Sequence, residues 1–265
     1  MKALWLTMRQ PGRSEMGYNH GIVGKLTRWS MALAITAGFA IQPARAAEEG
    51  IALAIVYDTS GSMRESVPSG DGKSAPKYVI ANKALTAIVN RVGQFATNGP
   101  GNAPRKIEAG LWIFHNEGAT EAVKFGAFDA AALKGWIRQF SQPTGSTPLG
   151  NSIRVASKAV LDSNLSHKHV VVITDGMNTS GPKPERVIPG IQTAAKAKSG
   201  EISFHFVAFD VDAKVFEPVK NLGATVVGAA NEQQLNKQLE FIFEKKILLE
   251  DEEPAHPAVE KPKNP

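Results

Sequence analysis

The sequence predicts an α/β protein with a doubly wound, mostly parallel six-stranded sheet flanked by helices. Short β-rich runs alternate with longer helical patterns over about 200 residues, which is typical of this fold class. Several of the short runs, such as VVVIT at 170–174, are apolar at every position. Such a run indicates a strand of a parallel sheet that is covered on both faces. The chain has 265 residues, 43% of them hydrophobic, which is enough for one sizeable core.

The six expected strands differ in length and in how they connect. The run at 122–125 follows the run at 107–115 too closely for a helical crossover, so we expect it to be an antiparallel edge strand. The expected strands are 51–57, 107–115, 122–125, 169–174, 202–209 and 224–227.

Between the strands, apolar residues recur at helical spacing. The segment 129–140 begins with Asp129, a residue that favours the N-cap position. The expected helices are 77–95, 129–140, 149–161, 185–198, 213–222 and 232–248.

The first 46 residues are typical of a secretory signal peptide. Lys25 and Arg28 precede an apolar run at 31–41, and Ala44 and Ala46 form an A-x-A cleavage pattern. The apolar run is shorter than the ~18 residues of a membrane-spanning helix. An uncleaved anchor and a buried helix are the alternative interpretations. We therefore expect a secreted, periplasmic protein with a domain at 47–248 and a disordered tail, rich in Pro and charge, at 249–265.

The formal net charge of +5 belongs to this leader. Residues 1–46 hold six of the 30 Lys and Arg residues and one of the 25 acids, which leaves 24 of each in the rest of the chain. The charge is therefore no indication of nucleic-acid binding. The absence of cysteine excludes disulfides, thiolate metal sites and a lipoprotein anchor.

Oxygen-bearing side chains follow the predicted strands at the edge where such sheets bind ligands. Asp58, Ser60 and Ser62 come directly after the first strand, and Asp175 follows the fourth. Thr147 lies in the loop PTGSTPLG, before a helix. If the first and fourth strands are neighbours, these five side chains converge. Hard oxygen donors without imidazole or thiol favour Mg²⁺, Mn²⁺ or Ca²⁺ over Zn²⁺ or Cu²⁺.

The segments DTSGS, GSTPLG and VVVITDG together resemble a von Willebrand factor type A domain with a complete metal-ion-dependent adhesion site (MIDAS). The resemblance covers roughly residues 50–243, nearly the whole chain after the leader, and points to a bacterial secreted member. It implies the strand order 3-2-1-4-5-6. It also implies that Ser60, Ser62 and Thr147 touch the metal, and that Asp58 and Asp175 act directly or through water.

By the same resemblance, a carboxylate of a bound protein takes the sixth metal position. The protein is then a binding module and not an enzyme. Residues near the metal are expected to form a rim that contacts the partner: Met63, Arg64, His115 and Met177.

Two other functions remain open at this point. Asp58 after a strand also resembles the nucleophile of haloacid-dehalogenase-like phosphatases, but their second aspartate is replaced here by Ser60, so the leaving group lacks a proton donor. An accessory subunit that helps to assemble or metallate another enzyme is the second alternative.

The loop GDGKS at 70–74 lacks the first glycine of a phosphate-binding loop, and we expect a solvent loop.

Two further pairs of residues are weighed against the site. His167 and His169 begin a predicted strand at the opposite edge, so we expect them to be a solvated surface pair. Asp210 and Asp212 end the fifth strand, which is expected to be one strand too far from the metal.

Overall fold

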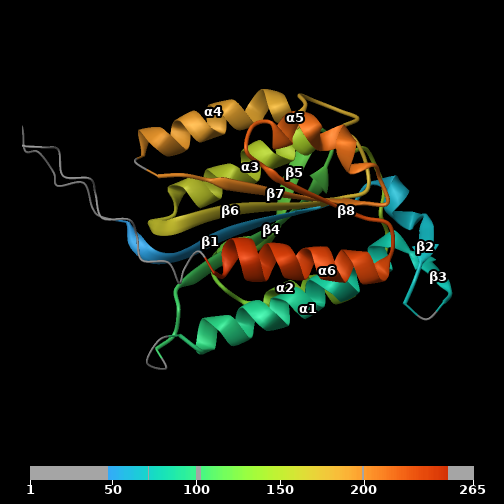
Figure 1. Cartoon of the computed structure of the whole chain (residues 1–265), viewed down its shortest axis with the longest axis horizontal. Helices are drawn as coiled ribbons and strands as arrows, with labels where there is room; N and C mark the ends of the chain where they lie inside the picture. The colour runs from blue at the N-terminus through green and yellow to red at the C-terminus, as the bar shows by residue number, and fades with distance from the viewer. Residues whose placement is uncertain (1–46, 71, 100–102, 199, 250–265) are drawn as a thin grey trace, which may run out of the picture. The chain divides into compact units, whose positions relative to one another are not determined.

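Six strands form one mixed sheet, seen edge-on in the computed structural model (Figure 1). Only β5 runs antiparallel to its neighbour β4, and the other pairs are parallel. This order confirms the predicted 3-2-1-4-5-6 arrangement with an antiparallel edge strand. From edge to edge the strands are β5 (Gly118–Ala127), β4 (Ile107–His115), β1 (Glu48–Tyr57), β6 (Leu165–Thr174), β7 (Ser203–Phe209) and β8 (Thr225–Ala229).

The structure describes residues 47–70, 72–99, 103–198 and 200–249. The predicted signal peptide and all but the first residue of the predicted tail lie outside these ranges. Within the described part of the chain, no helix is both long and apolar enough to cross a membrane.

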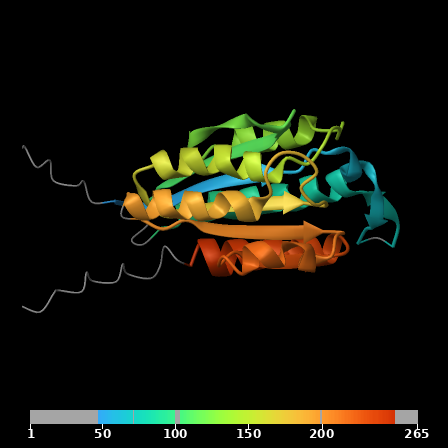
Figure 2. The same cartoon turned by 90° about the horizontal axis from the view of Figure 1, so that it is seen from above.

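Helices cover both faces of the sheet, as Figures 1 and 2 show. One face packs against α1 (Lys77–Thr97), α2 (Ala130–Gln139), α6 (Glu232–Ile242) and the π-helical turn η4 (Phe243–Ile247). The other packs against α3 (Leu149–Asp162), α4 (Pro184–Ala197) and α5 (Glu217–Lys220). Asp129 caps α2, as predicted, by accepting hydrogen bonds from the amides of Ala131 and Ala132.

The packing of strand β1 explains why its sequence is apolar from Ile51 to Tyr57. Ile51, Leu53 and Ile55 pack into the core under α1 and α6, whereas Ala52 and Val56 pack under α3. Adjacent side chains of a strand point to opposite faces, so both cores draw on this central strand. The small residues stand on the α3 side.

The histidine prediction is wrong for His169. Strand β6 begins at Leu165, four residues earlier than expected, so His169 lies inside the sheet and is fully buried. It contacts the buried His205 on β7, with Nδ1 of His169 3.2 Å from Nε2 of His205. His167 is partly exposed and pairs with Glu49.

The segment between β1 and α1 contains structure that the sequence did not indicate. After the 3₁₀ turn η1 (Gly61–Arg64), strands β2 (Ser66–Pro68) and β3 (Ser74–Pro76) form an antiparallel hairpin. Gly70, Gly72 and Lys73 of the GDGKS segment therefore lie between the two strands of a hairpin. The amide of Gly70 donates to Glu232 at the start of α6, which ties the hairpin to the domain. The predicted helix at 213–222 is also divided, into the 3₁₀ turn η3 (Ala213–Phe216) and α5.

Candidate metal centre

Asp58 directly follows the last residue of β1, at the carboxyl end of the strand, between the neighbouring strands β4 and β6. Tyr57 pairs with Ile113 of β4 and Ile173 of β6, and the Asp58 amide still donates to the Ile173 carbonyl at 2.9 Å. The side chain is fully buried. Asp58 therefore forms the floor of the site.

Two donors orient the Asp58 carboxylate. The Ser60 amide donates to Oδ1 at 2.8 Å, which closes a tight turn after the strand. The hydroxyl of Thr174, the last residue of β6, donates to Oδ2 at 2.6 Å. Thr174 has no place in the predicted motif, although it directly precedes Asp175. Its contact with Asp58 follows from the parallel pairing of β1 and β6.

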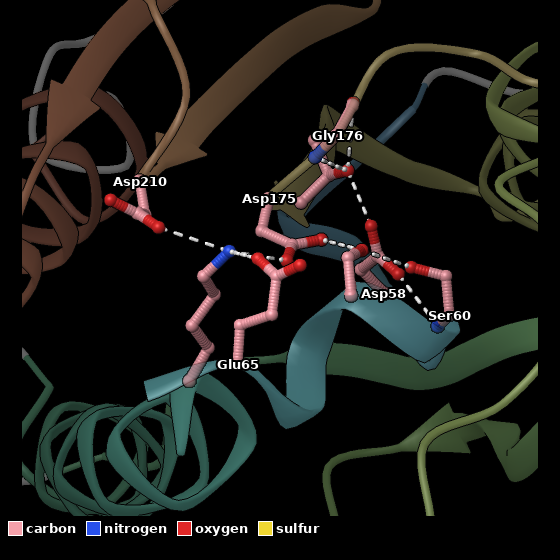
Figure 3. Close-up of polar contacts among 9 residues, drawn as sticks. Asp58, Ser60, Glu65, Asp175, Gly176 and Asp210 are labelled. Carbon is pink, nitrogen blue, oxygen red and sulfur yellow. Dashed lines mark hydrogen bonds and ion pairs between the residues drawn. The ribbon is translucent and has the colours of Figure 1, made fainter. Parts of the chain in front are cut away.

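Ser60, Ser62 and Asp175 lie in one hydrogen-bonded chain beside Asp58 (Figure 3). The hydroxyl oxygens of Ser60 and Ser62 are 3.0 Å apart. Ser62 donates to Oδ1 of Asp175 at 2.8 Å. Residues 113 positions apart in the sequence thus meet because β1 and β6 are adjacent in the sheet.

Thr147 is buried at the start of α3, against the loop that follows Asp175. Its amide donates to the Thr179 hydroxyl at 2.8 Å, and the Thr179 amide donates to its carbonyl at 3.0 Å. Its hydroxyl faces Gly176, where an added methyl group would lie 3.8 Å away. The same loop reaches the β1 end, because the Gly61 amide donates to the Gly145 carbonyl at 3.2 Å. The structure therefore brings all three predicted loops together.

The four expected rim residues differ in exposure. Met177 is 61% exposed, and Arg64 and His115 are also exposed. Arg64 donates through Nε to the Pro143 carbonyl at 2.6 Å. Met63 is fully buried in the core under η1, so the expectation that it contacts a partner is wrong. The 3₁₀ turn directs its side chain inward while the neighbouring Arg64 points to solvent.

Lys77 supplies a positive charge beside Asp175, and the sequence interpretation did not identify it as a site residue. It begins α1, its side chain is 3% exposed, and its Nζ lies 3.0 Å from Oδ2 of Asp175. The same Nζ lies 2.8 Å from Glu65 and 3.0 Å from Asp210. Figure 3 shows the Glu65 and Asp210 carboxylates on the side of Asp175 away from Ser60. Asp210 is therefore near the site after all, although it reaches Asp175 only through this lysine.

The charges of the site favour a cation near Asp58. Burial first and the charge of Asp175 second raise the pKa of Asp58 to about 6, although the hydrogen bonds from Ser60 and Thr174 act to lower it. The Lys77 ammonium contacts the carboxylates of Glu65, Asp175 and Asp210. A buried carboxylate with a raised pKa gains more from a bound cation than an exposed one does.

The donor set also fits a hard divalent cation. The hydroxyls of Ser60 and Ser62 and the carboxylate of Asp175 are joined by hydrogen bonds, and Asp58 and Thr147 are buried in the adjoining loops. Among the described residues, no cluster of three or more His, Cys, Asp or Glu side chains could hold a metal. Hydroxyl and carboxylate oxygens are ligands that Mg²⁺, Mn²⁺ and Ca²⁺ accept.

Comparisons with known proteins agree with this fold. The model of the von Willebrand factor type A domain matches residues 52–242. The chain resembles the VWA domain of SpRpn10 with a TM-score of 0.52 and 11% identity, over 71% of this chain and 93% of that one. The vWF domain of the type V pili tip protein Mfa5 from Porphyromonas gingivalis gives 0.51 and 13%, over 73% and 93%. No curated protein matches the sequence.

The family match covers most of the chain and includes every predicted site residue. Domains of this family are generally protein-interaction modules and often depend on a bound metal. The phosphohydrolase alternative is not favoured by these findings. The chain belongs to the von Willebrand factor type A domain family.

Proposed function

We propose that this protein is a metal-dependent binding module that holds a partner protein by one of its acidic side chains. The observation that carries the proposal is the hydrogen-bonded chain from Ser60 through Ser62 to Asp175, beside the buried Asp58. Five oxygen donors gathered at the ligand-binding edge of such a sheet suit Mg²⁺, with Mn²⁺ or Ca²⁺ as substitutes.

Each side chain has a distinct task in this proposal. Ser60, Ser62 and Thr147 supply neutral oxygens to the cation, and Asp58 and Asp175 balance its charge directly or through water. A divalent cation held by these residues would supply a Lewis acid that could accept a carboxylate from outside the chain. Because three of the five donors are uncharged, the cation retains enough positive charge to attract that carboxylate.

The surface beside the centre suits a protein partner. A hollow of about 240 Å³ lies next to the loops that carry Thr147 and Asp175. Its lining is mainly apolar, including Leu149, the exposed Met177 and Val215, with one cation, Lys183, and one acid, Glu185. Apolar contacts around a central polar anchor are typical of protein interfaces.

We further propose that the protein is exported to the periplasm, with residues 1–46 as its signal peptide and residues 47–248 as the mature domain. The charged segment, apolar run and A-x-A pattern of the leader support this proposal.

Affinity capture from cell-envelope extracts tests the proposed function. Wild-type protein and the Asp58→Asn variant are used in parallel, each with Mg²⁺ and with chelator. We expect a partner that only the metal-loaded wild type retains, and that is lost when one of its Asp or Glu residues is replaced. Equal retention in chelator would contradict the proposal.

Thr147→Val should weaken metal binding more than it weakens the fold. Valine has the volume of threonine and leaves the backbone contacts with Thr179 in place, but it removes one oxygen donor. We expect Mn²⁺ affinity, measured by calorimetry, to fall by about ten- to a hundredfold. Thr193→Val on α4 is the matched control, since it removes a hydroxyl that bonds only to the Pro189 carbonyl. Equal Mn²⁺ affinity of Thr147→Val and wild type would exclude Thr147 as a ligand.

A further inference from the structure

Lys77 is a buried lysine that contacts a carboxylate of the proposed metal centre. Its ammonium contacts three carboxylates, those of Glu65, Asp175 and Asp210, at 2.8, 3.0 and 3.0 Å. Its side chain is almost completely buried, although it stands at the first position of a helix. A buried ammonium is costly unless it is paired, so three carboxylate contacts make this placement stable.

Asp175 divides its two oxygens between Lys77 and the hydroxyl pair. Oδ1 accepts from Ser62 at 2.8 Å, and Oδ2 accepts from Lys77 at 3.0 Å. The ammonium therefore fixes the rotation of the carboxylate and presents Oδ1 to the serines. It also places a full positive charge on the other side of the carboxylate that accepts from Ser62.

We propose that Lys77 is a positioning residue and resident counter-ion of the metal centre. It keeps Asp175 aligned while no metal is bound, and its charge lowers the affinity of the centre for a divalent cation. This inference rests on the proposed metal centre. Two charges less than about 10 Å apart in a partly buried site interact strongly. In this proposal, the repulsion between Lys77 and a bound cation is larger than the free energy gained from holding the Asp175 carboxylate in place.

The three carboxylates around Lys77 come from different parts of the sheet edge. Glu65 follows η1, which carries Ser62, and Asp210 follows β7. Asp210 has a left-handed backbone with φ of 54°, and its amide donates to the Ala229 carbonyl at 2.7 Å. Lys77 thus links the ends of β6 and β7 to the segment that follows η1.

Lys77→Met tests the proposal by removing the charge while keeping an unbranched side chain. We expect Mn²⁺ affinity, measured by calorimetry on the full chain, to rise by about tenfold or more. The metal-free variant should unfold at a lower temperature than the wild type, and the rise on adding Mn²⁺ should be larger. Lys77→Arg, which retains the charge, should restore the wild-type affinity.

Arg91→Met is the matched control. It removes one positive charge from the same helix, about 21 Å farther along its axis, and should leave Mn²⁺ affinity unchanged. If Lys77→Met binds Mn²⁺ no more tightly than wild type, the proposal is overturned. If wild type itself binds no divalent cation, the proposed metal centre fails, and this inference fails with it.

A second variant keeps the test decisive should Lys77→Met fold poorly. Asp210 is 38% exposed, and asparagine tolerates its left-handed backbone. Asp210→Asn removes one carboxylate from Lys77 and leaves more of its charge directed at Asp175. We expect Mn²⁺ affinity to fall severalfold, and an unchanged or higher affinity would contradict the role of Lys77.

Discussion

Asp58→Asn will abolish divalent-metal binding and leave the fold intact. Asparagine has the shape of aspartate, and its carbonyl oxygen still accepts a hydrogen bond from Ser60 or Thr174. The negative charge beside the two serine hydroxyls is lost. Because Asp58 is fully buried, an acidic side chain at the surface cannot take its place and supply the missing charge. Calorimetric titration with Mg²⁺ and Mn²⁺ should show saturable binding to the wild type and none to the variant.

The same variant should be more stable than the metal-free wild type near pH 7. The pKa of Asp58 is raised to about 6 by burial and by the charge of Asp175, so the folded protein binds this proton more tightly than the unfolded chain. Stability is therefore lost as pH rises from about 4 to about 6, by about 3 kcal/mol at most. Asparagine has no charge to lose, so the variant escapes this cost.

Asp129→Asn is the matched control for both measurements. It removes one carboxylate but retains a good N-cap for α2, so metal binding and stability should stay at wild-type values. Metal binding by Asp58→Asn with unchanged affinity would place the cation elsewhere. A metal-free variant less stable than wild type would show that the Asp58 charge is compensated within the fold.

The sheet could be predicted because each of its signals is local. Apolar runs, a capping aspartate and the spacing between strands can each be recognised from residues close together in the sequence. Strands β1, β4 and β6 contain the apolar runs that predicted them. The convergence of Asp58 and Asp175 followed from one topological step, the adjacency of β1 and β6. By contrast, the small hairpin of β2 and β3 has only three residues in each strand, too few for a period to be recognised.

What could not be predicted depends on side chains that meet across the fold. Lys77 is one lysine at the start of an amphipathic helix, and such residues are usually solvated. Only the positions of Glu65, Asp175 and Asp210 in space explain why it is buried. Met63 is the opposite case, since a polar turn surrounds it in sequence while its side chain enters the core.

His169 shows how an error of four residues in a strand boundary changes a prediction. Placed at the first residue of a strand, it was expected to be solvated. Within β6, His169 lies on the same face of the sheet as Val171, and this face packs against the helices. The pattern SHKH gives no apolar signal, so the beginning of β6 could not be recognised from periodicity.

The buried His169 and His205 pair should make the protein lose stability as pH falls below about 6.5. The two rings are stacked with centroids 5.5 Å apart, and burial lowers the pKa of each. The pKa of His205 falls to about 4, with the charge of Lys246 as a second cause, and that of His169 falls well below its usual range. Below the unfolded value, the unfolded chain binds protons that the folded protein does not.

The linkage gives about 2 kcal/mol of lost stability at pH 5 from His205 alone, and His169 adds to the loss in the same direction. Urea unfolding at pH 7.5 and pH 5 of wild type and of the double variant His169→Leu/His205→Leu isolates this contribution, because Asp58 titrates in both proteins. Leucine fills the buried space without a proton to gain, so the double variant should lose at least about 2 kcal/mol less between the two pH values. His115→Gln, which removes an exposed ring, is the matched control. If the double variant and the wild type lose equal stability, the histidine pair is not the cause of acid sensitivity.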